Sequence, residues 1–315
     1  MAGGGTMTLF PEHVEDYLRL RRAFGHKLVE PGRTLPRFAA HLQATGVEFV
    51  TVDAALAWAL EPEAAPESVV RARRMMVVRG FAGYMAGIDP RTEIPPAGLI
   101  PFRQRWRPPF IYTEADVVAL MAQAHQSIPG PLGAATLETL IGLLAATGLR
   151  ISEAIKLDRR DIDWSEGALL VRESKFDKSR HVALRESALQ ALGRYARRRD
   201  ELCPRPREES FFVSVRGTRL NRSSIEKTFR MLCEASGVGA EAMLPPRIHD
   251  LRHTFAVNTL LGWYREGVNV QARLHSLSTY MGHRQPRSTY LYLSAAPELL
   301  AHAAGLLEAA QEVTL

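Results

Sequence analysis

Six prolines lie close together in the first half of this 315-residue chain and limit what can fold around them. Proline lacks a backbone N–H and has a fixed φ, so helix interiors and central strands tolerate it poorly. We therefore expect the segment from Gly87 to Pro109 to be an extended linker. We place this linker at residues 89–110 with a domain on each side, and the chain length also suggests two domains. The prolines are Pro90, Pro95, Pro96, Pro101, Pro108 and Pro109.

The residues before the linker have the apolar spacing of α-helices. Apolar side chains recur every three to four residues between Val14 and Phe24 and between Leu35 and Leu42. Residues 1–88 are expected to form a bundle of about four helices. Two of these helices are predicted at residues 52–60 and 67–85, and the separators are Pro31-Gly32, Gly46 and residues 62–66.

The residues after the linker, 111–295, are predicted to form a domain with both helices and strands. Thr113 is a plausible helix N-cap, because acidic residues follow it in the first turn. Residues 168–173 and 181–184 have strand-like composition and flank a polar turn, which predicts a hairpin. The whole chain is therefore expected to be mainly α-helical with a small β-sheet. Further helices are predicted at residues 113–125, 137–146, 151–155, 187–198, 222–235, 272–281 and 297–311, with another that includes His249.

Charge and composition narrow the classes of partner. The chain carries 40 Lys and Arg against 34 Asp and Glu, a formal net charge of +6, which favours polyanions such as nucleic acid. Its two cysteines form no CxxC pair, so we expect free thiols in a reducing cytoplasm and no metal cluster. The first residues lack the pattern of a signal peptide, and the most apolar window is too short to cross a membrane.

A histidine and an arginine lie three residues apart after a Pro-Pro turn. On a helix, His249 and Arg252 share one face and present an imidazole and a fixed cation to one target, for which a phosphate is suitable. Asp250 and His253 face other directions and are expected to hold the helix or orient the site.

Four more side chains are candidates for the same chemistry, although each has an ordinary structural explanation when taken alone. Arg150 follows Gly148-Leu149 and has Glu153 as a helical ion-pair partner. Lys175 lies in the predicted hairpin turn, where Lys178 and Arg180 are alternatives. His283 would cap a helix end, and Tyr292 with its neighbour Tyr290 would pack in a core.

Taken in order, these residues resemble the tyrosine recombinases, also called phage-type integrases. The resemblance consists of Arg150 within Thr-Gly-Leu-Arg-Ile-Ser-Glu, Lys175 in a hairpin, His249-x-x-Arg252-His253, Gly282-His283, and Tyr292 nine residues later. It covers residues 113–293, and the helical first domain is similar in character to the SAM-like core-binding domain of that family. It implies a catalytic domain at residues 111–295 and a C-terminal helix at 296–315 that docks on its own domain or is exchanged between subunits.

The resemblance implies a site-specific DNA recombinase that works by transesterification. Tyr292, preferred over Tyr290, would attack a backbone phosphate to form a 3′-phosphotyrosyl link and release a 5′-hydroxyl. His249 would accept the tyrosine proton, and Lys175 would be the general acid on the leaving oxygen. Because the bond energy is retained, the reaction needs no metal, no ATP and no other cofactor.

The remaining roles concern the phosphate and the duplex. Arg150 and Arg252 would clamp the nonbridging oxygens, and His283 would add a hydrogen bond there. The resemblance implies double-stranded DNA as the partner, bound by a homo-tetramer, alone or with other recombinases. Contacts to DNA phosphates are expected from Arg71, Arg74, Arg103, Arg105 and Arg107, although the linker arginines are equally consistent with a solvated basic segment.

The stretch between Arg252 and His283 is longer than in most members of the family. In this it resembles recombinases of transposons and insertion elements, which implies integration, excision or transposition of a mobile element. Two alternatives remain: a topoisomerase-like enzyme with the same chemistry but no synapsis, and an inactive or accessory DNA-binding partner of another recombinase.

Overall fold

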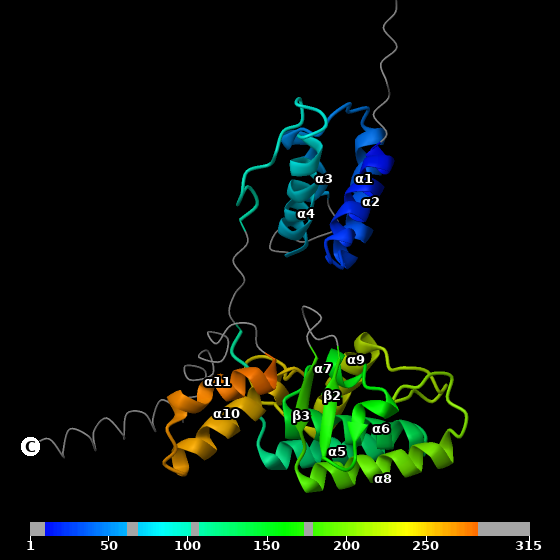
Figure 1. The fold of residues 1–315 in the computed structure, drawn as a ribbon, viewed down its shortest axis with the longest axis vertical. Coiled ribbons are helices and arrows are strands. Elements are labelled where there is room, and N and C mark those ends of the chain that lie inside the picture. The colour runs from blue at the N-terminus through cyan, green and yellow to red at the C-terminus, as the bar shows by residue number, and fades with distance from the viewer. Residues whose placement is uncertain (1–9, 62–68, 102–106, 173–178, 283–315) are drawn as a thin grey trace, which may run out of the picture. The chain divides into compact units, whose positions relative to one another are not determined.

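The computed structural model describes residues 10–61, 69–101, 107–172 and 179–282 (Figure 1). The chain separates into two compact units, residues 1–106 and 107–315. Each unit has its own hydrophobic core, so each is described separately.

The regular secondary structure in the described part of the first unit is all helical, as the periodicity predicts. Its helices are α1 (Phe10–Ala23), α2 (Val29–Ala44), α3 (Val52–Leu60) and α4 (Val69–Met85). They pack around aromatic side chains: the rings of Phe38 and Trp58 lie 5.1 Å apart, and those of Tyr17 and Phe81 lie 5.7 Å apart. Burial of these rings supplies much of the apolar surface that the small bundle removes from water.

The start of α2 corrects one sequence-based boundary. Pro31-Gly32 is expected from the sequence to separate two helices, but both residues lie in the first turn of α2, which begins at Val29. The first N–H groups of a helix have no partner within that helix, so a proline near its N-terminus removes no helical hydrogen bond. The Gly32 N–H already donates to the Leu28 carbonyl at 2.9 Å, which places the helix start ahead of the proline.

The described part of the proline-rich segment has neither helix nor strand, in agreement with its composition. It is nevertheless attached to the first unit. The Glu93 N–H donates to the Val50 carbonyl at 2.8 Å, and Arg79 Nε donates to the Pro95 carbonyl at 3.0 Å. Leu99 also packs against the first core. The segment as far as residue 100 therefore follows the helical unit.

The second unit is built around a buried helix, α6 (Pro131–Thr147). The long helices α5 (Glu114–Ser127), α8 (Glu186–Leu202) and α10 (Asp250–Arg265) pack against it. Thr113 caps α5 and forms a capping box with Asp116, as expected. The other helical elements are α7 (Ile151–Ala154), the 3-10 helix η1 (Arg159–Asp161), α9 (Arg222–Ser236) and α11 (Val270–Met281).

A small antiparallel sheet completes the second unit. Its strands run in the order β1 (Ile162–Asp163), β2 (Ala168–Val171) and β3 (Arg180–Ala183). The predicted hairpin is confirmed as β2–β3, and its last described pair before the turn joins Val171 to Arg180. β1 is not predicted from the sequence, because two residues are too few to show an alternating pattern.

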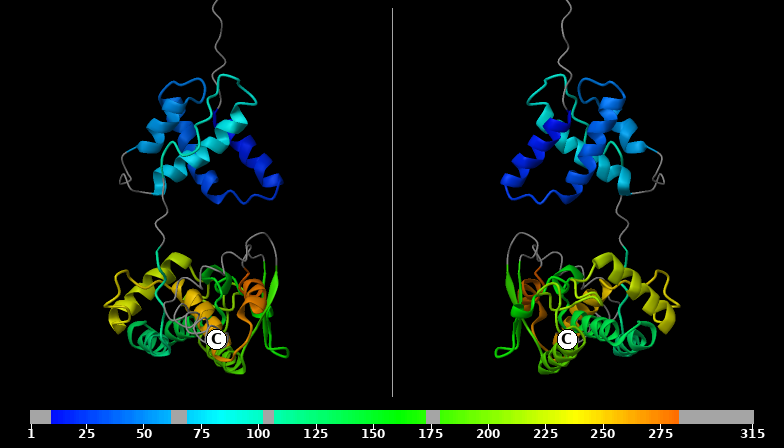
Figure 2. Two further views of the ribbon diagram at one scale, coloured as in Figure 1. Left: turned by 90° about the vertical axis from the view of Figure 1, so that its left-hand side faces the viewer. Right: turned by 90° about the vertical axis from the view of Figure 1, so that its right-hand side faces the viewer.

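Helix α11 lies beside the hairpin, as the side views of Figure 2 show. The Tyr280 hydroxyl donates to the Ala183 carbonyl at 3.2 Å and joins the end of α11 to β3. Arg150, at the start of α7, donates to the Gly282 carbonyl, so the end of α11, the hairpin and the turn that precedes α7 meet in one region of the unit.

Candidate active site

A left-handed turn places Arg150 at the surface of the second core. Gly148 ends α6 with φ +62°, and a Cβ atom at this position would lie 2.5 Å from the Phe255 ring. Only glycine combines that backbone conformation with so close an approach. The turn makes Arg150 the N-cap of α7, and its side chain remains about a quarter exposed.

Glu153 is the predicted partner of Arg150, and the structure confirms this contact. Glu153 accepts from the Arg150 backbone N–H at 3.0 Å and from Arg150 Nη1 at 2.7 Å. The Arg180 guanidinium donates to the same carboxylate at 2.9 and 3.2 Å. Burial by itself raises the pKa of Glu153, but the hydrogen bonds and charges of Arg180 and Arg150 outweigh burial and lower the pKa to about 2. The carboxylate is therefore ionised at neutral pH.

Three arginines from separate parts of the sequence donate to consecutive carbonyl oxygens at the end of α11. Arg180 Nε donates to Tyr280 at 2.8 Å, Arg252 Nη2 to Met281 at 2.6 Å, and Arg150 Nη2 to Gly282 at 2.9 Å. The last carbonyls of a helix have no partner within it and carry partial negative charge, so cations are favourable there. The arrangement ties α11 to α7, α10 and the hairpin.

Arg252 lies deeper than Arg150. Its guanidinium also donates to the Gly148 carbonyl at 2.6 Å, and the residue exposes only 3% of its surface. Arg252 thus joins the turn that precedes Arg150 to the end of α11, and less of its side chain is exposed to a ligand than that of Arg150.

His249 is the N-cap residue of α10 and is exposed on one side. Its ring lies edge-on to the His253 ring at 5.1 Å. The protein packed around the imidazole, with the neighbouring charges of His253 and Arg252, lowers the pKa of His249 to about 4. The imidazole is therefore neutral at pH 7 and is able to accept a proton.

Asp250 fixes the backbone in front of this histidine. Its buried carboxylate accepts from the backbone N–H of Arg247 at 3.0 Å and from Arg247 Nη2 at 2.7 Å. The sequence predicts Asp250 and His253 on other faces as supports. The structure brings His253 against the His249 ring, whereas Asp250 acts on the preceding turn through Arg247.

Three predicted site residues, Lys175, His283 and Tyr292, lie outside the described residues, as do Arg103 and Arg105. Among the predicted DNA contacts that are described, Arg74 lies 5.3 Å from the centre of the Trp58 ring, and its Nη1 donates to the Trp58 carbonyl at 3.5 Å. Arg71 lies on the same helix. Arg107 donates to the Pro245 carbonyl.

The sequence suggests Arg180 only as an alternative to Lys175. Its buried contacts with Glu153 and the end of α11 are not predicted. A usable signal is present in the strand pattern. Arg180 and Val182 lie two positions apart and share a face of β3, and Val182 is buried. An arginine on the buried face of a strand needs acceptors inside the protein, which here are Glu153 and the end of α11.

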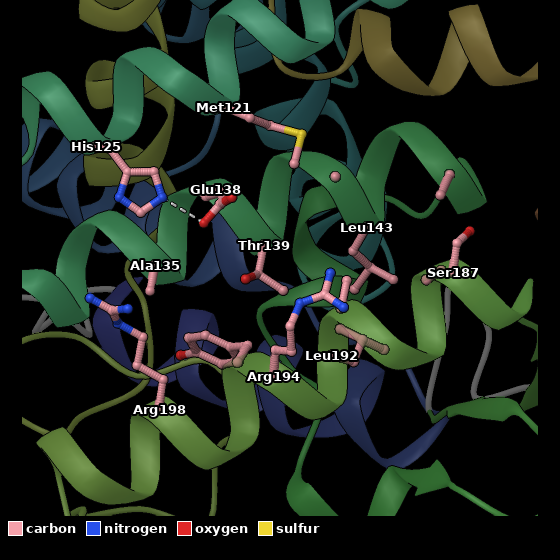
Figure 3. Close-up of a pocket in the computed structure, with 15 residues that line it drawn as sticks. Met121, His125, Ala135, Glu138, Thr139, Leu143, Ser187, Leu192, Arg194 and Arg198 are labelled. Atoms are coloured by element: carbon pink, nitrogen blue, oxygen red, sulfur yellow. Dashed lines mark hydrogen bonds and ion pairs between the residues drawn. The ribbon is translucent and has the colours of Figure 1, made fainter.

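A separate groove of about 430 Å³ lies between α5, α6 and α8 (Figure 3). His125 and Glu138 form a 2.7 Å contact on one side of it, and Arg194 and Arg198 of α8 line the other side. None of the predicted site residues that the structure describes lines this groove. Within the described ranges, no three metal-binding side chains come together, and no helix is long and apolar enough to cross a membrane.

Residues 111–298 match the phage integrase family. The chain belongs to that family. This recombinase is 39% identical over 308 residues to y4rB of Sinorhizobium fredii, a protein named as a putative integrase/recombinase, and the match covers 96% of this chain and 98% of the relative. It is 32% identical over 234 residues to the tyrosine recombinase XerD of Mycobacterium tuberculosis, covering 73% of this chain and 70% of XerD.

Solved structures share the fold of this recombinase. The Tn1549 transposon integrase bound to transposon right end DNA has a TM-score of 0.63 at 18% identity, covering 94% of this chain and 98% of that one. A lambda integrase tetramer bound to a Holliday junction gives 0.62 at 16% identity, with 91% and 78% covered. The mainly helical fold with its small sheet is thus confirmed. The protein is a tyrosine recombinase, a DNA strand transferase of site-specific recombination.

Proposed function

We propose that this recombinase cuts and rejoins DNA strands through a covalent bond between Tyr292 and a 3′-phosphate. The observation that supports the proposal best is the convergence of Arg150 and Arg252 on neighbouring carbonyls, those of Gly282 and Met281. These two arginines are separated widely in sequence, yet both hold the backbone ten or eleven residues before Tyr292.

Arg150 and Arg252 are proposed to bind the nonbridging oxygens of the scissile phosphate. A guanidinium has five N–H donors, and the side-chain hydrogen bonds of Arg150 to Glu153 and Gly282 use two of its nitrogen atoms. A partly exposed arginine that is already held in place can bind a phosphate without a large loss of side-chain entropy. Such fixed donors stabilise the charge that grows on these oxygens in the pentavalent transition state.

His249 is proposed as the proton acceptor for Tyr292. A tyrosine hydroxyl has a pKa near 10 and is a poor nucleophile at neutral pH unless a base assists it. The lowered pKa of His249 keeps its imidazole neutral and able to take that proton.

The step balances without any added reagent. The Tyr292 oxygen forms a bond to phosphorus, the bond from phosphorus to the 5′-oxygen breaks, and Lys175 gives a proton to that oxygen. His283 donates a hydrogen bond to a nonbridging oxygen. A 5′-hydroxyl from a partner strand then attacks the phosphorus and gives its proton to Lys175, while the bond from phosphorus to the Tyr292 oxygen breaks and His249 returns the proton to that oxygen.

In its cellular setting, we propose that the protein acts on double-stranded DNA as a homo-tetramer in the bacterial cytoplasm, alone or with other recombinases. Its task would be integration, excision or transposition of a mobile element. The integrase/recombinase name of its relative y4rB and the long stretch between Arg252 and His283 support this setting.

The test uses nicked duplexes tiled across the DNA that flanks the gene, because a nick beside the cut site traps the covalent adduct. Wild-type protein and Tyr290→Phe should form the adduct, and Tyr292→Phe should not. An adduct with Tyr292→Phe would contradict the assignment of the nucleophile. DNA binding without any adduct would favour the accessory DNA-binding partner instead. Relaxation of a plasmid that lacks the site, by a monomer, would favour a topoisomerase-like enzyme.

A further inference from the structure

We propose that Tyr112 is a positioning residue for His249, because its hydroxyl group holds the turn at which this histidine lies. The inference rests on the proposed function, in which His249 accepts the proton of the nucleophile. Tyr112 would touch neither the DNA nor the reacting atoms. It lies just before Thr113, the N-cap of α5, near the start of the second unit.

The hydroxyl group of Tyr112 reaches the carbonyl two residues before His249. It donates to the Arg247 carbonyl at 3.0 Å, and the Asp250 N–H donates to the same oxygen at 2.8 Å. A carbonyl oxygen has two lone pairs, so both hydrogen bonds can form at once. The backbone at the start of α10 is therefore held by a side chain that lies 135 residues earlier in the chain.

The backbone of Tyr112 is attached to the same helix further along. Its N–H donates to Thr254 Oγ1 at 3.0 Å, and Thr254 Oγ1 donates to the Asp250 carbonyl at 3.0 Å. His249 and Arg252 lie between these two points of attachment in the sequence. Tyr112 thus fixes the segment of α10 that carries both proposed site residues.

The ring of Tyr112 is itself packed firmly. The residue exposes only 2% of its surface, and its ring lies edge-on to those of Phe110 at 4.8 Å and Phe229 at 6.3 Å. Burial raises the pKa of the hydroxyl, which therefore remains protonated and donates at neutral pH. A donor buried so deeply is costly to leave unpaired, so the hydrogen bond to Arg247 is maintained.

Two neighbours of Tyr112 hold the Pro-Pro turn before His249. The Arg107 guanidinium donates to the Pro245 carbonyl. Gly239 has φ +75°, and a Cβ atom there would collide with Pro246 and lie 3.5 Å from the Phe110 ring. Residues 107–112 therefore contact the whole turn, and the hydroxyl of Tyr112 makes the contact nearest to His249.

Loss of this hydroxyl should loosen the turn while the ring stays in place. Tyr112→Phe removes one oxygen atom and leaves the Arg247 carbonyl with the Asp250 N–H alone. A general base must lie within about 2.6–3.2 Å of the group whose proton it takes, so a small shift of His249 slows proton transfer. DNA binding should change little, because the substitution removes no cationic side chain.

A double-mutant cycle tests whether Tyr112 acts through His249. We would measure DNA binding and single-turnover cleavage of a nicked duplex for wild type, Tyr112→Phe, His249→Asn and the double variant. The matched control is Tyr195→Phe, alone and with His249→Asn. Tyr195 of α8 is also 2% exposed, and its hydroxyl contacts Thr136 Oγ1 of α6 at 3.0 Å.

Tyr112→Phe should slow cleavage about 10-fold when His249 is present and less than about twofold in the His249→Asn background, as expected for coupled residues. Tyr195→Phe should have the same small effect in both backgrounds. Binding of DNA should stay normal in both single tyrosine variants.

Amide hydrogen exchange of the DNA-free protein gives a second readout that needs no cleavage. The Asp250 N–H shares its acceptor with the Tyr112 hydroxyl, so its exchange reports how firmly the turn is held. Exchange at Asp250 should be about fivefold faster in Tyr112→Phe, the usual effect of one hydrogen bond, and unchanged in Tyr195→Phe.

Three results would overturn the inference while leaving the proposed function intact: normal cleavage by Tyr112→Phe, an equal loss of cleavage in both backgrounds, and unchanged exchange at Asp250. If His249→Asn cleaves too slowly to measure, exchange at Asp250 and the rate of Tyr112→Phe decide. Wild-type cleavage by His249→Asn would instead contradict the proposed role of His249, and the role of Tyr112 with it. If wild type forms no adduct with any duplex, the proposed function fails, whatever the exchange shows.

Discussion

Arg252 donates a 2.6 Å hydrogen bond to the backbone carbonyl of Gly148, a residue 104 positions earlier in the chain. This contact joins the first turn of α10 to the turn that presents Arg150. It brings together two segments that the sequence shows only as separate short motifs. Because the guanidinium also holds Met281, one side chain sets the spacing of three backbone segments.

Replacing Arg252 by lysine should slow DNA cleavage, although the substitution keeps the positive charge. A lysine ammonium is a point charge and cannot form the two-pronged contact with Gly148 and Met281 while facing a phosphate. Cleavage by Arg252→Lys should fall about 100- to 1000-fold, the usual loss for one preorganised donor. The exposed Arg265 of the same helix supplies the control, and Arg265→Lys should cleave normally. Near wild-type cleavage by Arg252→Lys would argue against binding of the scissile phosphate by Arg252.

Gly148→Ala should lower the free energy of unfolding by about 1–3 kcal/mol, because the residue has positive φ and its new Cβ would clash with Phe255. Urea denaturation measures the change. Gly262→Ala is the control, since this residue lies inside α10 and, apart from the neighbouring residues and backbone of that helix, no atom lies within 4 Å of the place that its new methyl group would take. That variant should be as stable as wild type or more stable by up to about 1 kcal/mol. Equal effects of the two substitutions would contradict the requirement for glycine at position 148.

Glu153→Gln should destabilise the protein in a pH-dependent way. The folded pKa of about 2 is below the ordinary value of 4.5, so ionised Glu153 stabilises the fold above pH 4.5, and that stabilisation is lost as the pH falls toward 2. The lowered pKa corresponds to roughly 3 kcal/mol at neutral pH, since a tenfold change in proton affinity is about 1.4 kcal/mol. Urea denaturation at pH 7, 5 and 3 should show a constant difference from wild type at the first two values and a smaller one at pH 3.

The control for this measurement is Glu226→Gln. Glu226 forms an exposed ion pair with Arg222 on α9, a type of contact that contributes about 0.5 kcal/mol or less. If the two glutamine variants lost the same small amount of stability at pH 7, the buried Glu153 carboxylate would not stabilise the fold through Arg150 and Arg180.

His249 should remain neutral in the DNA-free protein at every pH above about 5. Its pKa is lowered to about 4, so the charged form is lost on raising the pH through 4 rather than through 6.5. NMR titration of the imidazole protons, assigned with a His249→Asn variant, measures this directly. A midpoint near 6.5 would mean that the surrounding protein and cations do not act on the ring as described.

Much of the fold can be predicted from local pattern. Residues 52–60 are predicted as a helix with the bounds that α3 has, and Thr113 is recognisable as the cap of α5. The ion pair of Arg150 with Glu153 is also predictable, because three residues along a helix bring side chains together.

The contacts that organise the site cannot be predicted in this way. Arg180 and Glu153 lie 27 residues apart, and nothing in the local sequence of either one names the other. The three carbonyls at the end of α11 carry no side-chain signal at all, since any residue supplies a carbonyl. Such contacts depend on tertiary packing of α11 against the hairpin, which periodicity does not encode.

In the proposed reaction Tyr292 becomes covalently joined to DNA, and peptide mapping of the trapped adduct tests this most directly. Wild-type protein would be trapped on a nicked duplex and digested with nuclease and protease, and the peptide carrying the nucleotide would be sequenced by mass spectrometry. We expect a 3′-phosphonucleotide on Tyr292 alone. The same modification on Tyr290, or on any other residue, would contradict it.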